Sequence, residues 1–328
     1  MSQAQDAAGG ELTPEQASEL VARLLARLEE HVLGQRAVAE QLAATYLAGG
    51  HALIEGVPGV GKTLLARCFA ALLGAELKRV QLTPDLMPTD LIGTNVFDQS
   101  AGRFHLVRGP IFTQVLLADE INRTPPKTQS ALLEAMQERQ VTIDGTSHVL
   151  DDGFFVVATQ NPIEHEGTYP LPEAQLDRFL TRITMGPPAA EAELELFRRA
   201  TRGRLTGWSQ DLPPAVTSPQ EARALRRAAR TVHVAEELLD YLARLAAAVR
   251  ESELLELAVS PRAALALLET ARAAALVDGR DYLVPDDLKR SLEPCWGHRL
   301  ILTAEAELEG HSAGQLLRRV ADEVEIPQ

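Results

Sequence analysis

Cysteine is scarce in this sequence, and positive charge is outnumbered by negative charge. Only two cysteines occur among the 328 residues, Cys68 and Cys295, and they lie far apart with no partner motif around either. Neither a disulfide framework nor a cysteine-based zinc site is therefore indicated. The formal net charge is −14, which argues against a general grip on DNA or RNA, since nucleic-acid phosphates attract clustered lysine and arginine. We expect no nucleic-acid partner.

Long apolar segments are missing as well. No apolar run approaches the roughly 20 residues that span a bilayer, and the N-terminus lacks the charged stretch followed by an apolar stretch that marks a signal peptide. We therefore expect a cytoplasmic protein with no membrane span. The apolar fraction of 45% is ordinary for a folded chain, and the length suffices for two domains.

Short apolar runs alternate with helical stretches in the first part of the chain. Strands that alternate with helices predict an α/β fold with a doubly wound parallel sheet, and near-continuous apolar strands fit burial on both faces. Apolar spacing also predicts a helix from Pro14 to about Glu30, capped by Thr13. The predicted strands are His51–Glu55, Leu77–Leu82, Gln114–Ala118, Phe154–Thr159 and Phe179–Thr184, and the helices between them are Lys62–Leu73 and about Lys127–Glu138.

The pattern changes near Pro187-Pro188. From Ala189 onward helices are indicated and no convincing strand is found. The predicted division is a flexible tail over residues 1–15, an α/β core over 16–186 and an all-helical domain over 187–328.

Two stretches interrupt the alternation inside the core. Residues 83–113 contain several prolines and glycines and show no obvious helix, and connections this long are often functional. Residues 141–145 alternate β-branched side chains and end in Asp-Gly, which predicts a hairpin within an excursion over about 141–153.

A glycine-rich loop follows the first strand. Residues 56–63 read Gly-Val-Pro-Gly-Val-Gly-Lys-Thr. The glycines let backbone N–H groups face inward as an anion nest, and the next helix points its positive end at the same place. Lys62 adds a charge for the terminal phosphates, and Thr63 offers a hydroxyl to Mg²⁺. The residues predicted to bind nucleotide here are Gly56, Pro58, Gly59, Val60, Gly61, Lys62, Thr63 and Leu64.

Polar residues follow two later strands at the edge where parallel strands end and ligands sit. Asp119 is predicted to hold Mg²⁺ and Glu120 to polarise the attacking water, although a strand leaving the core into a polar loop has the same pattern. Asn161 is predicted to orient water or to contact the γ-phosphate, although Asn-Pro also begins turns.

Two arginines complete the set of candidates. Arg178 precedes the last strand, and its alternative role is an ion pair with Asp177 or a neighbour. Arg262 follows Ser260 and Pro261, which cap and open a helix, so it lies in the first turn, where a cation opposes the helix dipole. An anion nearby would relieve this cost, and both ATP phosphates and a surface carboxylate are candidates.

These motifs occur in the order typical of AAA+ ATPases, and the sequence resembles the MoxR family in particular. The most specific stretch is Asp119–Glu138, DEINRTPPKTQSALLEAMQE. The likeness covers roughly residues 15–310. Supporting stretches are Val32–Gln35, Gly109–Phe112, Gln140–Gly145 and Leu171–Phe179.

The resemblance implies a P-loop NTPase core, a small all-α lid, and ATP hydrolysed with Mg²⁺ at the subunit interfaces of a hexameric ring. Asn161 would be the sensor 1 residue, Arg178 the arginine finger that reaches a neighbouring site, and Arg262 the sensor 2 residue on the lid. Residues 83–113 would be the helix-2 insert and 141–153 the pre-sensor hairpin. The residues implied near the adenine are Leu33, Gly34 and Gln35.

The resemblance also implies a chaperone-like role. Family members are described as maturing or activating partner complexes by metal or cofactor insertion, often with a von Willebrand factor A domain protein. Residues 83–113 contain no recognisable aromatic pore motif, so peptide threading is not expected. The competing hypotheses are a regulatory module that binds ATP with negligible turnover, a chelatase-like motor subunit, and a nucleic-acid motor, which the acidity disfavours.

Overall fold

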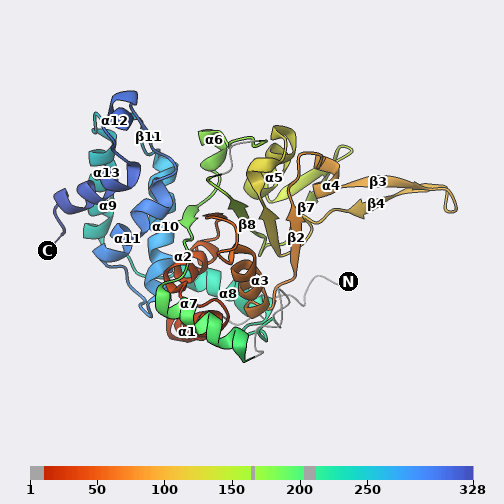
Figure 1. Cartoon of the computed structure of the whole chain (residues 1–328), viewed down its shortest axis with the longest axis horizontal. Helices are drawn as coiled ribbons and strands as arrows, with labels where there is room; N and C mark the ends of the chain where they lie inside the picture. Colours follow the sequence, from red (N-terminus) through yellow and green to blue (C-terminus); the bar gives the residue numbers. More distant parts are fainter. Residues whose placement is uncertain (1–10, 164–166, 203–211, 328) are drawn as a thin grey trace.

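The computed structural model describes residues 11–163, 167–202 and 212–327. Most of the predicted tail, residues 1–10, lies outside these ranges. A five-stranded sheet forms the centre of the molecule (Figure 1), in the order β2-β5-β8-β1-β9, and all neighbouring strands are parallel. The prediction of a parallel sheet is confirmed. The strands are β1 (Ala52–Glu55), β2 (Leu77–Gln81), β5 (Val115–Asp119), β8 (Phe155–Gln160) and β9 (Thr181–Thr184).

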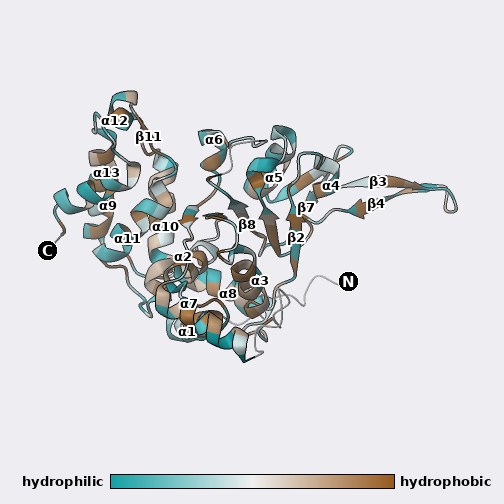
Figure 2. Ribbon diagram, in the orientation of Figure 1, coloured by the Kyte–Doolittle hydropathy of each residue, from teal (hydrophilic) through white to brown (hydrophobic). Residues whose placement is uncertain are grey.

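Helices cover both faces of the sheet, because successive side chains of a strand point to opposite faces. Ala52 and Ile54 of β1 pack in one core cluster, and Leu53 packs in the other. Figure 2 shows the brown, hydrophobic strands between helices whose outer faces are teal. On the first face lie α1 (Pro14–His31), α2 (Arg36–Leu47), α3 (Lys62–Leu72) and α8 (Pro219–Ala229), and on the second lie α4 (Pro88–Ile92) and α5 (Pro126–Glu138).

The first helix begins where the sequence predicts. Thr13 Oγ1 accepts the Gln16 N–H at 3.3 Å, and Gln16 Oε1 accepts the Thr13 N–H at 3.1 Å. This capping box satisfies two backbone donors that the helix itself cannot. Of the helices in the described ranges, none is both long and apolar enough to cross a membrane.

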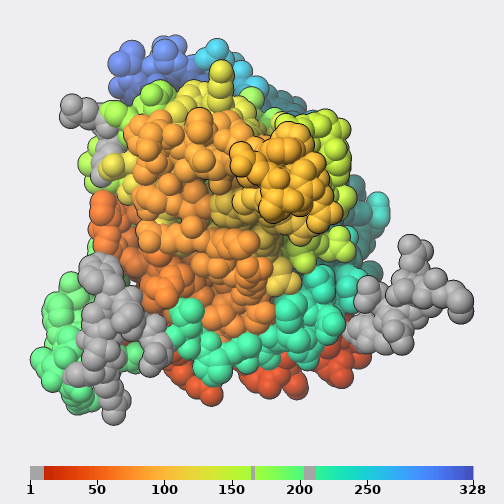
Figure 3. Space-filling model, turned by 90° about the vertical axis from the view of Figure 1, so that its right-hand side faces the viewer, coloured from red at the N-terminus to blue at the C-terminus, as the bar shows by residue number. Residues whose placement is uncertain are grey.

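Residues 83–113 are more regular than the sequence suggests. They contain the short helix α4 and an antiparallel ribbon of β3 (Gly93–Asp98) and β4 (Arg103–Arg108), so the expectation of a stretch without a helix is wrong. The ribbon projects from the body in Figure 1 and faces the viewer in Figure 3. Phe97 and Phe104 form a cross-strand pair with ring centroids 5.1 Å apart, and they are 50% and 67% exposed.

The two ends of the ribbon meet at its base. A Cβ on Gly109 would lie 2.6 Å from the Gly93 nitrogen, and a Cβ on Gly93 would lie 2.3 Å from the Val107 carbonyl oxygen. No side chain fits between backbones this close, so glycine is required at both positions.

The second predicted excursion is a hairpin, as expected. Strands β6 (Gln140–Ile143) and β7 (Thr146–Val149) pair in antiparallel register. Asp144 and Gly145 form the turn with φ of 47° and 78°. Two positive φ values give the turn a twist that matches the strands, which is why Asp-Gly is favoured here.

The C-terminal region is helical but not entirely so. A small antiparallel pair, β10 (Leu255–Leu257) and β11 (Ile301–Leu302), lies in it, so the expectation of no strand after Ala189 is wrong. Strands of three and two residues are too short for an alternating pattern to register. The remaining elements are η1 (Ile121–Arg123), α6 (Glu173–Leu176), α7 (Ala190–Thr201), α9 (Glu236–Arg250), α10 (Pro261–Val277), α11 (Pro285–Trp296), α12 (Ala304–Leu308) and α13 (Ala313–Glu323).

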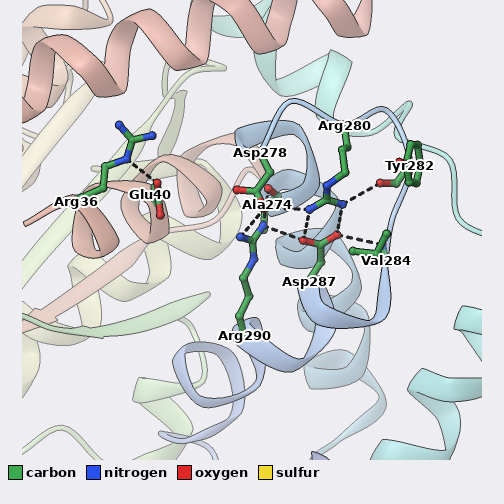
Figure 4. A network of polar contacts seen from close by, with 9 residues as sticks. All are labelled: Arg36, Glu40, Ala274, Asp278, Arg280, Tyr282, Val284, Asp287 and Arg290. Carbon is green, nitrogen blue, oxygen red and sulfur yellow. Dashed lines mark hydrogen bonds and ion pairs between the residues drawn. The ribbon is translucent and has the colours of Figure 1, made fainter. Parts of the chain in front are cut away.

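A buried ionic network fixes the connection between α10 and α11 (Figure 4). The carboxylate of Asp287 is fully buried and accepts two hydrogen bonds from Arg280, at 2.6 and 2.8 Å. Arg290 contacts the same carboxylate at 2.8 Å and also Asp278 at 2.7 Å. Charge-assisted, forked bonds of this kind fix how α10 and α11 meet.

Two buried histidines make the stability of the fold depend on pH. His51 Nδ1 accepts the Val156 N–H at 2.9 Å, and its Nε2 donates to the Met136 carbonyl at 3.1 Å, which joins β1 to β8 and α5. Burial lowers the pKa of His51 to about 3, and burial also lowers the pKa of His298 to about 3. Both rings are therefore neutral in the folded protein at neutral pH.

We expect the free energy of unfolding to fall as the pH drops below the unfolded pKa of about 6.5. Between that pH and about 3, each of these histidines is protonated in the unfolded chain but neutral in the folded one. Each therefore lowers the free energy of unfolding by up to about 1.4 kcal/mol per pH unit. Urea denaturation of the wild type and of His51→Gln between pH 7 and 4 measures this. The variant should show a shallower slope, and equal slopes would contradict the assignment.

Candidate nucleotide site

The loop between β1 and α3 has the backbone of a phosphate cradle. Gly59 and Gly61 have φ of 87° and 103°, which side chains rarely adopt. A Cβ on Gly56 would lie 2.3 Å from the Met185 carbonyl oxygen, so the loop and the end of β9 touch backbone to backbone. The curled loop and the N-terminus of α3 together present an anion-binding concavity.

Groups suited to phosphates and Mg²⁺ lie at the mouth of this loop. Lys62 Nζ donates to the carbonyls of Gly56 and, at 3.1 Å, Val57. Thr63 Oγ1 lies 3.3 Å from Asp119 Oδ2. A hydroxyl and a carboxylate on neighbouring elements are hard oxygen donors of the kind Mg²⁺ prefers, so these residues fit the metal that the resemblance implies.

Asp119 is held by two further side chains. Arg79 Nε on β2 contacts Asp119 Oδ2 at 2.7 Å, and Thr159 Oγ1 on β8 donates to Asp119 Oδ1 at 2.9 Å. The carboxylate is almost fully buried and bonded on both oxygens. Its orientation at the end of β5 is therefore fixed by the neighbouring strands.

Glu120 has an unusual backbone. Its φ and ψ of 59° and 54° are left-handed, which costs a non-glycine residue roughly 1–2 kcal/mol. The Thr159 hydroxyl accepts the Glu120 N–H at 3.0 Å, and Gln81 Nε2 donates to the Glu120 carboxylate at 2.6 Å. Arg123 lies 3.3 Å from the same carboxylate. Strained backbone held by its surroundings is typical of functional positions.

Asn161 is both a turn residue and a cavity residue. Its Oδ1 accepts the Ile163 N–H at 3.2 Å, which is the local turn that Asn-Pro favours. The side chain also lines the cavity beside the phosphate loop. Since Oδ1 is engaged, the amide nitrogen is the donor suited to a phosphate oxygen or a water.

The opposite end of the cavity is formed by the segment after α1. The Gln35 side chain is buried and donates to the Gly186 carbonyl at 2.8 Å. Gly34 has a φ of 69°, and a Cβ there would lie 2.7 Å from Ala192 Cβ on α7. This segment is therefore clamped between the end of β9 and α7, and it forms a mostly apolar end suited to a base.

These parts enclose one cavity of about 720 Å³, a volume typical of small-molecule sites. Of the predicted site residues, all of the loop from Pro58 to Leu64, both carboxylates and Asn161 line it, as do Leu33 and Gln35. The other lining residues are His31, Val32, Arg67, Arg79, Gln81, Thr159, Gln160, Pro188 and Leu196.

Arg178 and Arg262 are not among the lining residues. Arg262 is 61% exposed, and its Nη1 lies 4.0 Å from Asp177 Oδ2. Asp177 Oδ1 also accepts a hydrogen bond from Arg299 Nε at 2.7 Å. Of the two candidate anions for Arg262, the one it faces in this structure is a carboxylate, and this carboxylate directly precedes Arg178 in the chain.

Four residues of the site escape sequence reasoning. Arg79 and Gln81 alternate on β2 and point toward the carboxylates of β5, while Thr159 and Arg123 reach them from β8 and η1. The only signal in the sequence is weak: three of the five residues of β2 are polar, and the alternation of Arg79 and Gln81 puts these two on the same face of the sheet.

Comparisons with known proteins agree with this geometry. Residues 51–181 match the ATPase family associated with various cellular activities (AAA), and residues 247–320 match the AAA lid domain. The fold and the cavity thus define a P-loop ATPase of the AAA class with a helical lid. Within that class, the chain belongs to the MoxR family of AAA+ ATPases.

The relatives span nearly the whole chain. The Chaperone MoxR1 of Mycobacterium tuberculosis is 41% identical over 315 residues, which cover 93% of this chain and 82% of the relative. The Uncharacterized protein YeaC of Bacillus subtilis is 42% identical over 308 residues, covering 93% and 95%. A crystal structure of a proposed ATPase from Cytophaga hutchinsonii superposes with a TM-score of 0.87 at 38% identity, covering 96% of this chain and 97% of that one.

Proposed function

We propose that the chain binds and hydrolyses ATP with Mg²⁺ at the subunit interfaces of a ring, with a hexamer as the expected size. One observation carries the proposal. The phosphate loop and three polar residues line one cavity, whereas Arg178 and Arg262 are not among its lining residues, and Arg262 instead lies 4.0 Å from Asp177, which directly precedes Arg178 in the chain. Arginines that do not line the cavity of their own chain are available to complete the site of a neighbour.

Each cavity residue has a distinct role in this proposal. Thr63 and Asp119 hold Mg²⁺, which when bound neutralises phosphate charge. Lys62 and the backbone N–H groups of the loop bind the phosphates. Glu120 polarises the attacking water, and the Asn161 amide orients it. Preorganised charge of this kind is the main source of catalysis in phosphoryl transfer.

We further propose a chaperone-like output in the cytoplasm. ATP turnover would remodel a partner complex, with a von Willebrand factor A domain protein as the expected partner and metal or cofactor insertion as the expected result. The similarity to a relative named Chaperone MoxR1 supports this. The exposed Phe97–Phe104 pair on the projecting ribbon offers an apolar contact for a client.

The test is steady-state phosphate release measured over a range of protein concentrations. The rate per chain is expected to rise with concentration and then level off, because shared sites are complete only in assemblies. Lys62→Ala gives the background. Phosphate release no faster than this background at any concentration would indicate the regulatory module with negligible turnover. A rate per chain that does not depend on concentration, although sedimentation shows that the chains assemble over the same range, would contradict the shared site.

A further inference from the structure

Arg299 joins the lid to the core at one short segment. It lies just after α11 and is only 7% exposed. One of its hydrogen bonds goes to α11, at the Cys295 carbonyl. Its other bonds cross to the core. Nε contacts Asp177 Oδ1 at 2.7 Å, Nη2 contacts the carbonyls of Asp177 and Phe179 at 3.1 and 2.8 Å, and Nη1 contacts the Leu180 carbonyl at 3.2 Å.

Two neighbours of Arg299 bind the same segment. His298 Nε2 donates to the Phe179 carbonyl at 3.1 Å, and Cys295 Sγ donates to the Leu180 carbonyl at 3.4 Å. The lid thus holds the backbone immediately before and after Arg178. Because the backbone carbonyls on both sides of Arg178 are bonded to the lid, we expect a movement of the lid to displace Arg178 as well.

We propose that Arg299 is a positioning residue that sets Arg178 for the site of the neighbouring subunit. The inference rests on the proposed function, in which Arg178 acts in that site. Arg299 suits the task because a planar guanidinium reaches several acceptors in a fixed geometry, which a lysine cannot do. A movement of the lid in one chain is thereby transmitted to hydrolysis in the next.

The loose contact of Arg262 with Asp177 belongs to the same arrangement. Asp177 holds Arg299 at 2.7 Å but Arg262 only at 4.0 Å. The first contact is buried on the arginine side and the second is exposed, so the first is the durable one. Arg262 can therefore leave Asp177 for a phosphate without releasing the segment that carries Arg178.

Mixed assemblies separate this role from a structural one. Chains with Arg178→Ala retain an intact cavity, and chains with Lys62→Ala retain Arg178, so mixing them should restore hydrolysis at mixed interfaces. Arg299→Lys is then added to one chain or the other. In the Lys62→Ala chain it should lower the restored rate about 10- to 100-fold, because a misplacement of about 1 Å can cost two orders of magnitude. In the Arg178→Ala chain it should leave the rate within about twofold, since that chain supplies only the cavity.

Each outcome is decisive. Equal loss in both placements would assign Arg299 a merely structural role, and no loss in either would also overturn the inference. No restoration in the original mixture, with assembly verified by sedimentation, would instead refute the proposed function and the inference with it. The three results are distinct.

Two further variants guard against misfolding. Asp177→Asn keeps the backbone acceptors of Arg299 but replaces a charge-assisted bond with a neutral one of roughly half the strength, so it should show the same asymmetry with a smaller loss, about threefold. Arg280→Lys is the matched control, since Arg280 donates two hydrogen bonds to the buried Asp287 carboxylate within the lid (Figure 4). It should lower the melting temperature and leave the restored rate unchanged in both placements. An equal effect of Arg280→Lys would count against a specific role for Arg299.

Discussion

Replacing Arg178 with alanine in every chain should lower kcat for ATP hydrolysis by about a thousandfold. An arginine that enters a neighbouring site stabilises charge that develops only in the transition state, and such arginines are worth 10³ to 10⁵ in kcat. Binding of a non-hydrolysable ATP analogue should change little, because Arg178 does not line the cavity of its own chain. Phosphate release and analogue titration on the same preparation measure the two quantities.

The matched control for this variant is Arg182→Ala. Arg182 lies on β9, close to Arg178 in the chain, and its ion-pair partner is Glu55 at 3.8 Å. It should keep kcat near the wild-type value. A tenfold or smaller effect of Arg178→Ala, or an equal effect of both variants, would remove Arg178 from the catalytic set.

Glu120→Gln should also reduce hydrolysis strongly, by about 10² to 10⁴ in kcat, the range typical of a general base. The substitution keeps the size and shape of the side chain, so the left-handed backbone and the bond from Thr159 to the Glu120 N–H should persist. ATP should therefore still bind. Phosphate release measures the loss, and an unchanged rate would show that Glu120 does not activate the water.

The control is Glu134→Gln, which removes an exposed carboxylate from α5 and should leave kcat unchanged. Assemblies of Glu120→Gln held with ATP should also retain partners that the wild type releases. Identifying the proteins that co-purify with them, against Lys62→Ala as the background, tests the chaperone-like output directly.

The parts of the fold that the sequence predicts are those whose signals are local. The phosphate loop needs only its glycines and the strand and helix beside it, and the Asp144-Gly145 turn is defined by two residues. The central strands β1, β5 and β8 are apolar runs buried on both faces, so they are visible without knowledge of their neighbours. The two-residue β11 has no such signal, and it forms only because β10 lies opposite.

The parts of the site that escape prediction depend on contacts distant in sequence. Arg79 meets Asp119 across 40 residues, and Arg299 meets Asp177 across 122. Which strand lies beside β5, and where the lid rests, follow from packing of the whole chain and not from any local pattern. An arginine in a helical domain looks the same whether it is solvated or bonded to the core.

The base of the β3–β4 ribbon separates the sequence requirements of the ribbon tip from those of the ATPase core. Because Gly93 and Gly109 meet backbone to backbone, everything between them enters and leaves the ATPase at a single point. The tip of the ribbon, beyond the contacts that Asn95 and Leu106 make with the core, can therefore lengthen, shorten or change without altering the spacing of α4 or β5. If the ribbon binds the client, as proposed above, a change confined to its tip would fit the protein to a new client while the ATPase core stays the same.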